Sequence, residues 1–230
     1  MKTKFLTVLF LFFACIFISN AQQRIIGGET IDISQAPYQV AIFNNSKQTF
    51  GGGMLLNNQW ILTAKHIVEG ASASTIKISL GHNNPSTDTN RLSISQIVFY
   101  SSLVDDDIAL LKLSSPVTFS SNIAPIYISS GTSYTINTSC EVTGWGRTSI
   151  NGSSPNPQLK RCEVSLQSCS GKNIYTKPSS NTPFKGDSGG ALTIDASGYK
   201  MAIGIVAGGD SDNPTSTSVR YMNIVTTMIG

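Results

Sequence analysis

The chain has 230 residues, of which only 13% are charged, and its formal net charge is +3. The length suits a single all-β domain. Three of the 16 basic residues, Lys2, Lys4 and Arg24, lie in a leader without acidic residues, so 13 basic residues remain against 13 acidic ones. This balance gives no reason to expect a nucleic-acid partner.

The first 21 residues are typical of a secretory signal peptide. Lys2 and Lys4 precede an apolar run from Phe5 to Ile18, and small residues at Ser19 and Ala21 predict cleavage after Ala21. The run is shorter than the roughly 20 residues that span a bilayer, which argues against a membrane anchor. We therefore expect a secreted protein, extracellular or periplasmic, without membrane attachment once the leader is removed.

A second processing site is expected at Arg24, where a basic residue precedes two apolar residues and two glycines. Residues 22–24 would form an activation propeptide, and cleavage would free the amine of Ile25. Glycines would let this amine fold inward, and a buried ammonium needs a buried anion. Asp187 is the expected partner. The alternative is an ordinary strand entry.

The central part of the chain predicts strands. The segments 38–42, 75–80 and 92–97 alternate between apolar and polar residues with a period of two. Clusters of Ser, Thr, Asn and Gly separate them at short spacing, as in a sandwich or a barrel. Long helical patterns are absent, so the fold class is expected to be all-β.

His66 and Asp107 are candidates for a catalytic pair. His66 follows an apolar strand end that would hold its ring, whereas His82 lies in a turn sequence and is expected to be exposed. Asp107 opens another apolar strand, and its carboxylate could fix the tautomer of His66 and stabilise the imidazolium. The neighbours Asp105 and Asp106 are expected to be solvated.

The segment 184–190 predicts a nucleophile. Ser188 stands between glycines, and the N–H groups of Gly186 and Ser188 could hold the oxyanion of a tetrahedral intermediate. The alternative is a surface turn. An α/β-hydrolase needs a histidine after the serine, and none follows Ser188. An order of Asp, His and Ser would need Asp32, which no motif surrounds, so the order His, Asp, Ser remains.

Five short motifs occur in an order that resembles the chymotrypsin/trypsin family of serine proteases. The similarity extends from Ile25 to about Tyr221, and each motif is modest while the ordered set is specific. The nucleophile motif is closest to the granzyme and chymase branch. The motifs are Arg24–Gly28, Thr63–His66, Asp107–Leu111, Gly144–Gly146 and Gly186–Gly190.

The resemblance implies a fold of two six-stranded antiparallel β-barrels, with the active site in the cleft between them and a short C-terminal helix. A trypsin-like protease domain is expected over residues 25–230. Its first barrel would cover about 25–118 and its second about 119–230.

Cysteine usage departs from the family. Phe50, Ile67 and Phe184 occupy positions where the family usually carries cysteines, so packing is expected to replace those disulfides. The mature chain keeps an odd number of three, so one thiol is expected to be free or paired with another chain. Cys162 could pair with Cys140 or with Cys169, and the sequence does not choose between these pairs.

Three further departures touch the expected site. Lys65 replaces the small residue usual before the histidine, and Ala207 replaces a serine that usually donates to the catalytic aspartate. Gly208 replaces a tryptophan that usually walls the substrate cleft. None of these changes removes a catalytic group, but each is expected to loosen the support of one.

The resemblance places the primary substrate pocket at Thr182, Gly209 and Val219. Thr182 carries no charge, and a buried Lys or Arg side chain without a counter-ion would be costly. We therefore expect a small or medium apolar residue before the scissile bond. Strand alternation points Arg220 away from the side that Val219 faces. A one-residue slip would instead place Arg220 in the pocket and favour acidic residues.

The sequence thus predicts a secreted serine endopeptidase that a separate protease activates by cleavage between Arg24 and Ile25. It would act as a monomer on protein or peptide substrates, with protein inhibitors as further partners and without a metal or organic cofactor. The alternative is a catalytically weak or inactive homologue that binds protein through the same cleft.

Overall fold

The computed structural model describes residues 25–101 and 106–229. The signal peptide expected over 1–21, the propeptide expected over 22–24 and Asp105 lie outside the described residues. Strands dominate the described part. Among its helices, none is long and apolar enough to cross a membrane.

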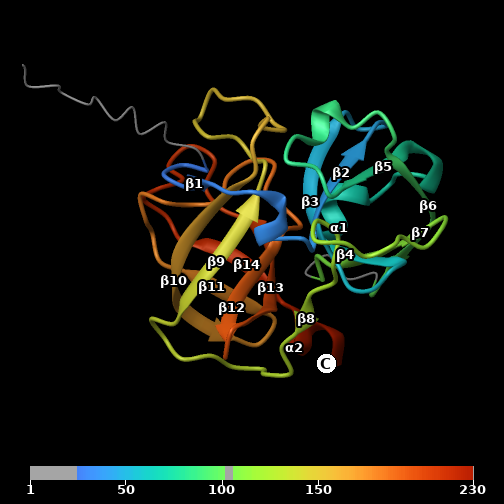
Figure 1. Ribbon diagram of the computed structural model, residues 1–230. Helices are drawn as coiled ribbons and strands as arrows, with labels where there is room; N and C mark the ends of the chain where they lie inside the picture. Colours follow the sequence, from blue (N-terminus) through green and yellow to red (C-terminus); the bar gives the residue numbers. More distant parts are fainter. Residues whose placement is uncertain (1–24, 102–105, 230) are drawn as a thin grey trace, which may run out of the picture.

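The first half of the chain closes into an antiparallel barrel (Figure 1). Its strands follow the order β2–β3–β4–β7–β6–β5, and β5 pairs back with β2. The three alternating segments of the sequence become β2, β5 and β6. The bounds are β2 (Gln39–Asn44), β3 (Thr49–Leu55), β4 (Trp60–Thr63), β5 (Ile76–Leu80), β6 (Leu92–Phe99) and β7 (Ala109–Leu113), with short helices η1 (Ile33–Gln35), α1 (Lys65–Val68), η2 (Ala73–Thr75) and η3 (Pro85–Thr87).

The second half forms an eight-stranded sheet that contains a second closed ring. The ring follows the order β9–β10–β11–β14–β13–β12 and closes because β9 pairs with both β10 and β12. Strand β1 extends it beside β10, and β8 runs parallel to β13. The bounds are β1 (Glu29–Thr30), β8 (Tyr127–Ile128), β9 (Ser139–Gly144), β10 (Lys160–Ser170), β11 (Asn173–Thr176), β12 (Ala191–Ala196), β13 (Tyr199–Gly208), β14 (Val219–Asn223) and the C-terminal helix α2 (Ile224–Ile229).

Two six-stranded barrels and a short C-terminal helix confirm the predicted fold class. One apolar cluster joins the barrels, since it contains Val40 and Leu62 of the first and Trp145 and Ile205 of the second. A second cluster fills the interior of the second barrel and includes Ile25. The two barrels therefore share a continuous core, along which loops from both can meet.

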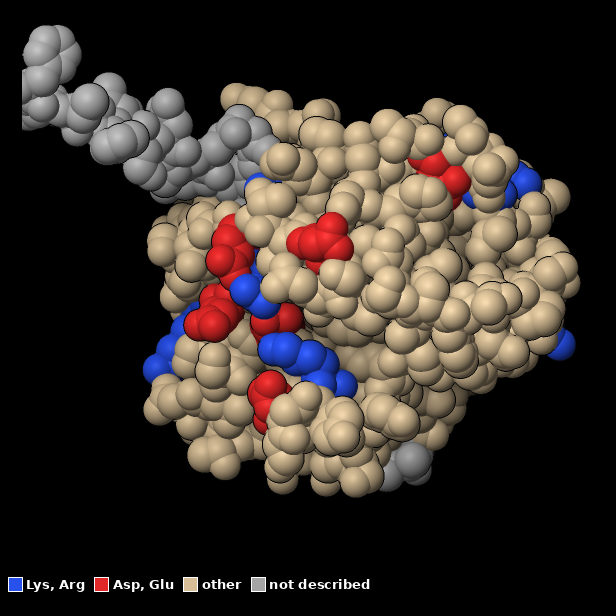
Figure 2. Space-filling view, viewed as in Figure 1, with Lys and Arg blue, Asp and Glu red and all other residues tan. Residues whose placement is uncertain are grey.

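Charged side chains of both signs lie on the sheet of the second barrel. The guanidinium of Arg161 contacts Glu29 and lies 3.6 Å from Oε2 of Glu141, which is also 3.1 Å from Nζ of Lys200. Figure 2 shows positive and negative side chains intermixed on this side of the molecule. This chain of ion pairs ties β1 to β10, β9 and β13 along their polar face.

All three cysteines of the described residues are free thiols. Cys140 lies opposite Val164 and Cys162 lies opposite Val142, so the two cysteines are offset by two residues along β9 and β10. Neither disulfide that the sequence left open is formed. In the first barrel, Ile67 is 4% exposed and packs over the backbone of Gly51, which fits the predicted replacement of a disulfide by apolar packing.

Candidate active site

His66 and Asp107 form a two-point contact in the first barrel. His66 lies in α1, directly after β4, and Asp107 precedes β7, the strand paired with β4. Nδ1 of His66 is 2.7 Å from Oδ2 of Asp107, and the backbone N–H of His66 donates to Oδ1 over 2.9 Å. With Nδ1 engaged, Nε2 is left as the ring nitrogen that can exchange a proton with a substrate or nucleophile.

The environment of Asp107 keeps its carboxylate ionised. Burial alone would raise the pKa of Asp107, but the hydrogen bonds and charge of His66, with a further contribution from Arg220, lower it below its ordinary value. Asp107 is therefore suited to stabilise an imidazolium at His66. Because Ala207 stands where the family usually has a serine, no hydroxyl from this position helps to lower the pKa of Asp107.

Asp106 is not solvated, contrary to the expectation from sequence. It is 1% exposed, its Oδ1 lies 2.6 Å from Nζ of Lys172, and Ser101 donates to its Oδ2 over 2.6 Å. The hydrogen bond from Lys172 is the main reason that the pKa of Asp106 is lowered. Lys172 comes from the hairpin between β10 and β11, so this ion pair joins the second barrel to the residue beside Asp107.

Ser188 lies on a loop of the second barrel that docks against the first. Gly52 of β3 donates its N–H to the carbonyl of Ser188 over 2.7 Å. Gly189 has a φ of +85°, and a Cβ there would lie 2.3 Å from Oγ1 of Thr63 and 3.2 Å from N of Ala64. Only glycine allows this approach, and it brings Ser188 beside the end of β4, where His66 follows.

Two backbone donors of this loop have no acceptor among the described residues. These are the N–H groups of Gly186 and Ser188, and Gly186 has a φ of +101°. The intervening N–H of Asp187 is used, since it donates to the carbonyl of Phe184 over 2.9 Å. Unpaired donors on either side of a partly exposed serine are what an oxyanion needs.

Asp187 is fully buried behind the loop. Gly146 donates its N–H to Oδ1 and Phe184 donates its N–H to Oδ2, each over 2.8 Å. Burial raises the pKa of Asp187 to about 6, although these two hydrogen bonds act in the opposite direction. Ile25 is also fully buried, in the cluster inside the second barrel. No cation contacts the Asp187 carboxylate in the described part of the chain.

A cavity of about 130 Å³ opens beside Ser188 and is called the Ser188 pocket below. Gly209 and Val219 line it, as expected, and so does Pro183. Thr182 is not among the lining residues, because it is 3% exposed and its N–H is bonded to the carbonyl of Ile26.

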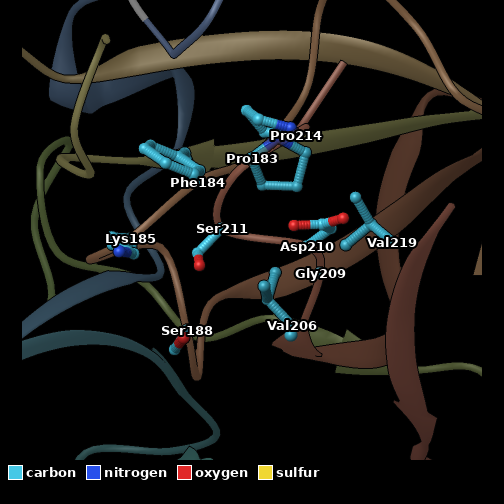
Figure 3. Close-up of a pocket in the computed structure, with 11 residues that line it drawn as sticks. Pro183, Phe184, Lys185, Ser188, Val206, Gly209, Asp210, Ser211, Pro214 and Val219 are labelled. Carbon is cyan, nitrogen blue, oxygen red and sulfur yellow. The ribbon is translucent and has the colours of Figure 1, made fainter. Parts of the chain in front are cut away.

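Sequence reasoning did not find Asp210 and Pro214, which also line the Ser188 pocket. Figure 3 shows the Asp210 side chain on the Val219 side of the pocket, away from Ser188. Oδ1 of Asp210 accepts hydrogen bonds from the N–H groups of Asp212 and Asn213, and these bonds lower its pKa. A D-x-D-N turn sequence was the only available signal.

A second, more open hollow of about 380 Å³ lies beside His66 and is called the His66 hollow below. Val219 lines the Ser188 pocket while Arg220 lines this hollow, as strand alternation predicts. Among the described residues no group of three His, Cys, Asp or Glu side chains could hold a metal ion. The lining residues of the hollow are Lys65, His66, Glu69, Asp107, Ala207 and Arg220.

Comparison with known proteins identifies the family. The model of the family named Trypsin matches residues 25–228. This chain belongs to the trypsin family. It is 35% identical to trypsin of Sus scrofa over 153 residues, which is 64% of this chain and 63% of that protein. It is 34% identical to serine protease 1 of Rattus norvegicus over 156 residues, 65% of this chain and 60% of that protein.

A third relative matches to a similar extent. Trypsin II-P29 of Gallus gallus is 36% identical over 167 residues, which cover 67% of this chain and 64% of that protein. The matched part of the chain thus spans about three fifths of the length of these trypsin-family relatives. The described site lies within the segment that the family model covers.

Proposed function

We propose that the protein is a secreted serine endopeptidase. The single observation that carries this proposal is the two-point contact of His66 with Asp107, held beside a loop that presents Ser188 and two unpaired N–H groups. Membership of the trypsin family supports it. Secretion rests on the leader sequence of residues 1–21.

In this mechanism Oγ of Ser188 attacks the scissile carbonyl while Nε2 of His66 accepts its proton. The N–H groups of Gly186 and Ser188 bind the oxyanion, and Asp107 stabilises the imidazolium. His66 then passes the proton to the leaving amine as the peptide C–N bond breaks. Water repeats the sequence on the acyl-enzyme and regenerates Ser188.

The protein would be made as a zymogen. Cleavage after Arg24 by an activating protease frees the ammonium of Ile25, which pairs with the buried carboxylate of Asp187. Burial of both residues supports this step, and so does the raised pKa of a carboxyl that contacts no cation among the described residues. Pairing would fix the loop that carries the N–H donors of Gly186 and Ser188.

The substrates would be proteins or peptides with a small or medium apolar residue before the scissile bond. Val219 and Pro183 give the Ser188 pocket an apolar wall. The carboxylate of Asp210 also lines this pocket, but it is exposed and already bonded to two N–H groups. The protein would act as a monomer, and protein inhibitors would control its activity.

A fluorophosphonate probe tests this function directly. Protein cleaved after Arg24 is expected to be labelled at Ser188, and Arg24→Gln protein treated with the same trypsin-like protease is expected to remain uncleaved and poorly labelled. Ser188→Ala is the matched negative control. Absence of label on correctly cleaved, folded protein would favour the alternative, a protein-binding homologue, for which the missing hydroxyl at Ala207 is the supporting observation.

A further inference from the structure

The His66 hollow contains a cation that the proposed mechanism does not use. Arg220 is half-buried there, and its Nη1 lies 3.4 Å from Oδ1 of Asn173 and 3.5 Å from Sδ of Met222. No carboxylate is in ion-pair contact with Arg220 anywhere in the described chain. A guanidinium has five N–H donors, and with only Nη1 in contact, the N–H groups of Nε and Nη2 have no partner among the described residues.

A β-bulge explains why this side chain is uncovered. The pairing of β13 with β14 passes from Val206 opposite Tyr221 to Gly208 opposite Arg220, which leaves Ala207 as the extra residue. Bulges of this kind redirect side chains near active sites. A Cβ built at Gly208 would have nothing within 4 Å, so the strand opposite Arg220 presents only backbone and open space.

The other charged groups of the hollow already have partners. Nζ of Lys65 lies 3.5 Å from Oε1 of Glu69, and Asp107 is engaged by His66. Arg220 acts on Asp107 through its charge but contacts no carboxylate among the described residues, so it is the cation of this lining whose hydrogen-bond donors are left for a ligand. A planar guanidinium fork matches a carboxylate, which it can bind through two parallel hydrogen bonds.

The Ser188 pocket and the His66 hollow both border the end of β13. This arrangement indicates which residue of a bound substrate would enter each of them. In an extended peptide, successive side chains point to opposite faces. If the residue before the scissile bond fills the Ser188 pocket and the peptide lies extended along the end of β13, the residue before it would point away from that pocket and towards the His66 hollow, which Ala207 of β13 lines. The fourth residue before the bond shares that face, and the third does not.

We propose that Arg220 is a specificity-determining residue that binds an acidic side chain of the substrate at the second or fourth residue before the scissile bond. The inference rests on the proposed endopeptidase function and deepens it, since it names the class of substrate. It adds a charge requirement next to the apolar residue that the Ser188 pocket takes.

Matched peptides test the inference. Each pair carries Glu or Gln at the second, third or fourth residue before the same apolar residue, and kcat/KM is measured with enzyme whose active sites are counted with the fluorophosphonate probe. The Glu:Gln ratio is expected to be about tenfold at the second or fourth residue, the effect of one charge-assisted hydrogen bond, and near one at the third.

Variants then assign the ratio to Arg220. Arg220→Met keeps the stem without the charge and is expected to bring the Glu:Gln ratio to about one, while Arg220→Lys retains a ratio above one. Lys172→Met removes a neighbouring cation that does not line the hollow, and should keep the full ratio. The ratio is taken within each variant, so any change that acts through Asp107 cancels.

Two results would overturn the inference: a ratio near one at both positions in the unaltered enzyme, or an undiminished ratio in Arg220→Met. If correctly cleaved protein takes no label, the endopeptidase proposal fails instead. The same peptides, now carrying a fluorescent label, are then titrated onto Ser188→Ala protein and their anisotropy is measured. Weaker binding of the Gln peptides still supports a carboxylate site at Arg220, and equal binding removes it.

Discussion

Asp187 is expected to give the single-chain and the cleaved forms opposite responses to pH. In the single chain, burial raises the pKa of Asp187 from an ordinary 3.8 to about 6. The unfolded chain therefore releases this proton first as pH rises, and the single chain loses stability between about pH 4 and pH 6. The pKa of Asp187 rises by about two units, and each unit corresponds to about 1.4 kcal/mol, so the single chain loses about 3 kcal/mol of stability over this pH range.

In the cleaved form, the ammonium of Ile25 pairs with Asp187 and lowers the pKa of that carboxyl. Its contribution to stability is present above the ordinary carboxyl pKa and is lost as pH falls. Pairing raises the pKa of the Ile25 amine above its unfolded value of roughly 7.7–8.0. The contribution of the amine to stability is therefore full below that value and is lost as pH rises through the raised pKa. The stability advantage of cleavage should widen from pH 4 to pH 6, stay level to about pH 8 and then decline.

Urea unfolding measures this advantage. Both forms are prepared in the Ser188→Ala background, which prevents self-digestion, and their free energies of unfolding are compared at pH 4 and pH 7. The difference between the forms should grow by at least about 3 kcal/mol. Groups that titrate alike in both forms cancel. In an Asp187→Asn control the difference should no longer depend on pH over this range.

The reasoning would be refuted if the difference between the two forms stayed constant from pH 4 to pH 7, or if the single chain gained on the cleaved form. Either result would mean that Asp187 has found another counter-ion in the single chain, or that the freed amine does not reach it.

Three further outcomes are expected. Ser188→Ala and His66→Ala should each remove nearly all peptidase activity, because the side chains of Ser188, His66 and Asp107 act as a unit. Asp107→Asn should lower turnover by on the order of 10⁴. Initial rates on one peptide measure all three variants, and near-normal turnover in any of them would contradict the role of that residue. Lys172→Met should lower the free energy of unfolding, measured in urea, by about 1–2 kcal/mol, because it leaves Asp106 buried without its ion-pair partner. Adding Asp106→Asn should recover much of that loss. If the losses of the two substitutions simply added, Lys172 and Asp106 would not be coupled. A peptide-library profile should show cleavage after small or medium apolar residues, and dominant cleavage after Lys or Arg would contradict this pocket assignment.

The sequence predicts those parts of the molecule that local patterns determine. Period-two alternation predicts β2, β5 and β6, and the motifs around His66 and Ser188 mark two segments that the fold brings close together. Strand alternation also placed Val219 and Arg220 on opposite sides of β14. Such features depend on neighbours within a few residues, so a single sequence carries them.

Features that depend on distant partners were missed. Asp106 was expected in solvent, but its partner Lys172 lies 66 residues away in sequence, on the other barrel, where no local pattern points to it. The uncovered position of Arg220 depends on a bulge that sets Gly208 opposite it, and the register of two strands separated by a loop is not encoded in either strand alone. The sequence around Asp210 likewise does not show that this residue lines the Ser188 pocket, because that position depends on how the chain after β13 lies relative to distant residues.

The absence of disulfides leaves the second barrel with built-in reporters of its own opening. Cys140 and Cys162 are each 2% exposed, and burial raises the pKa of Cys140 to about 11 and that of Cys162 well above its ordinary value. Reagents attack the thiolate, so these two thiols are silent while β9 and β10 stay paired. Cys169 is also free but partly exposed, so it can react without opening. The slower reaction of Cys140 and Cys162 in native buffer therefore measures how often β9 and β10 separate, without any substitution.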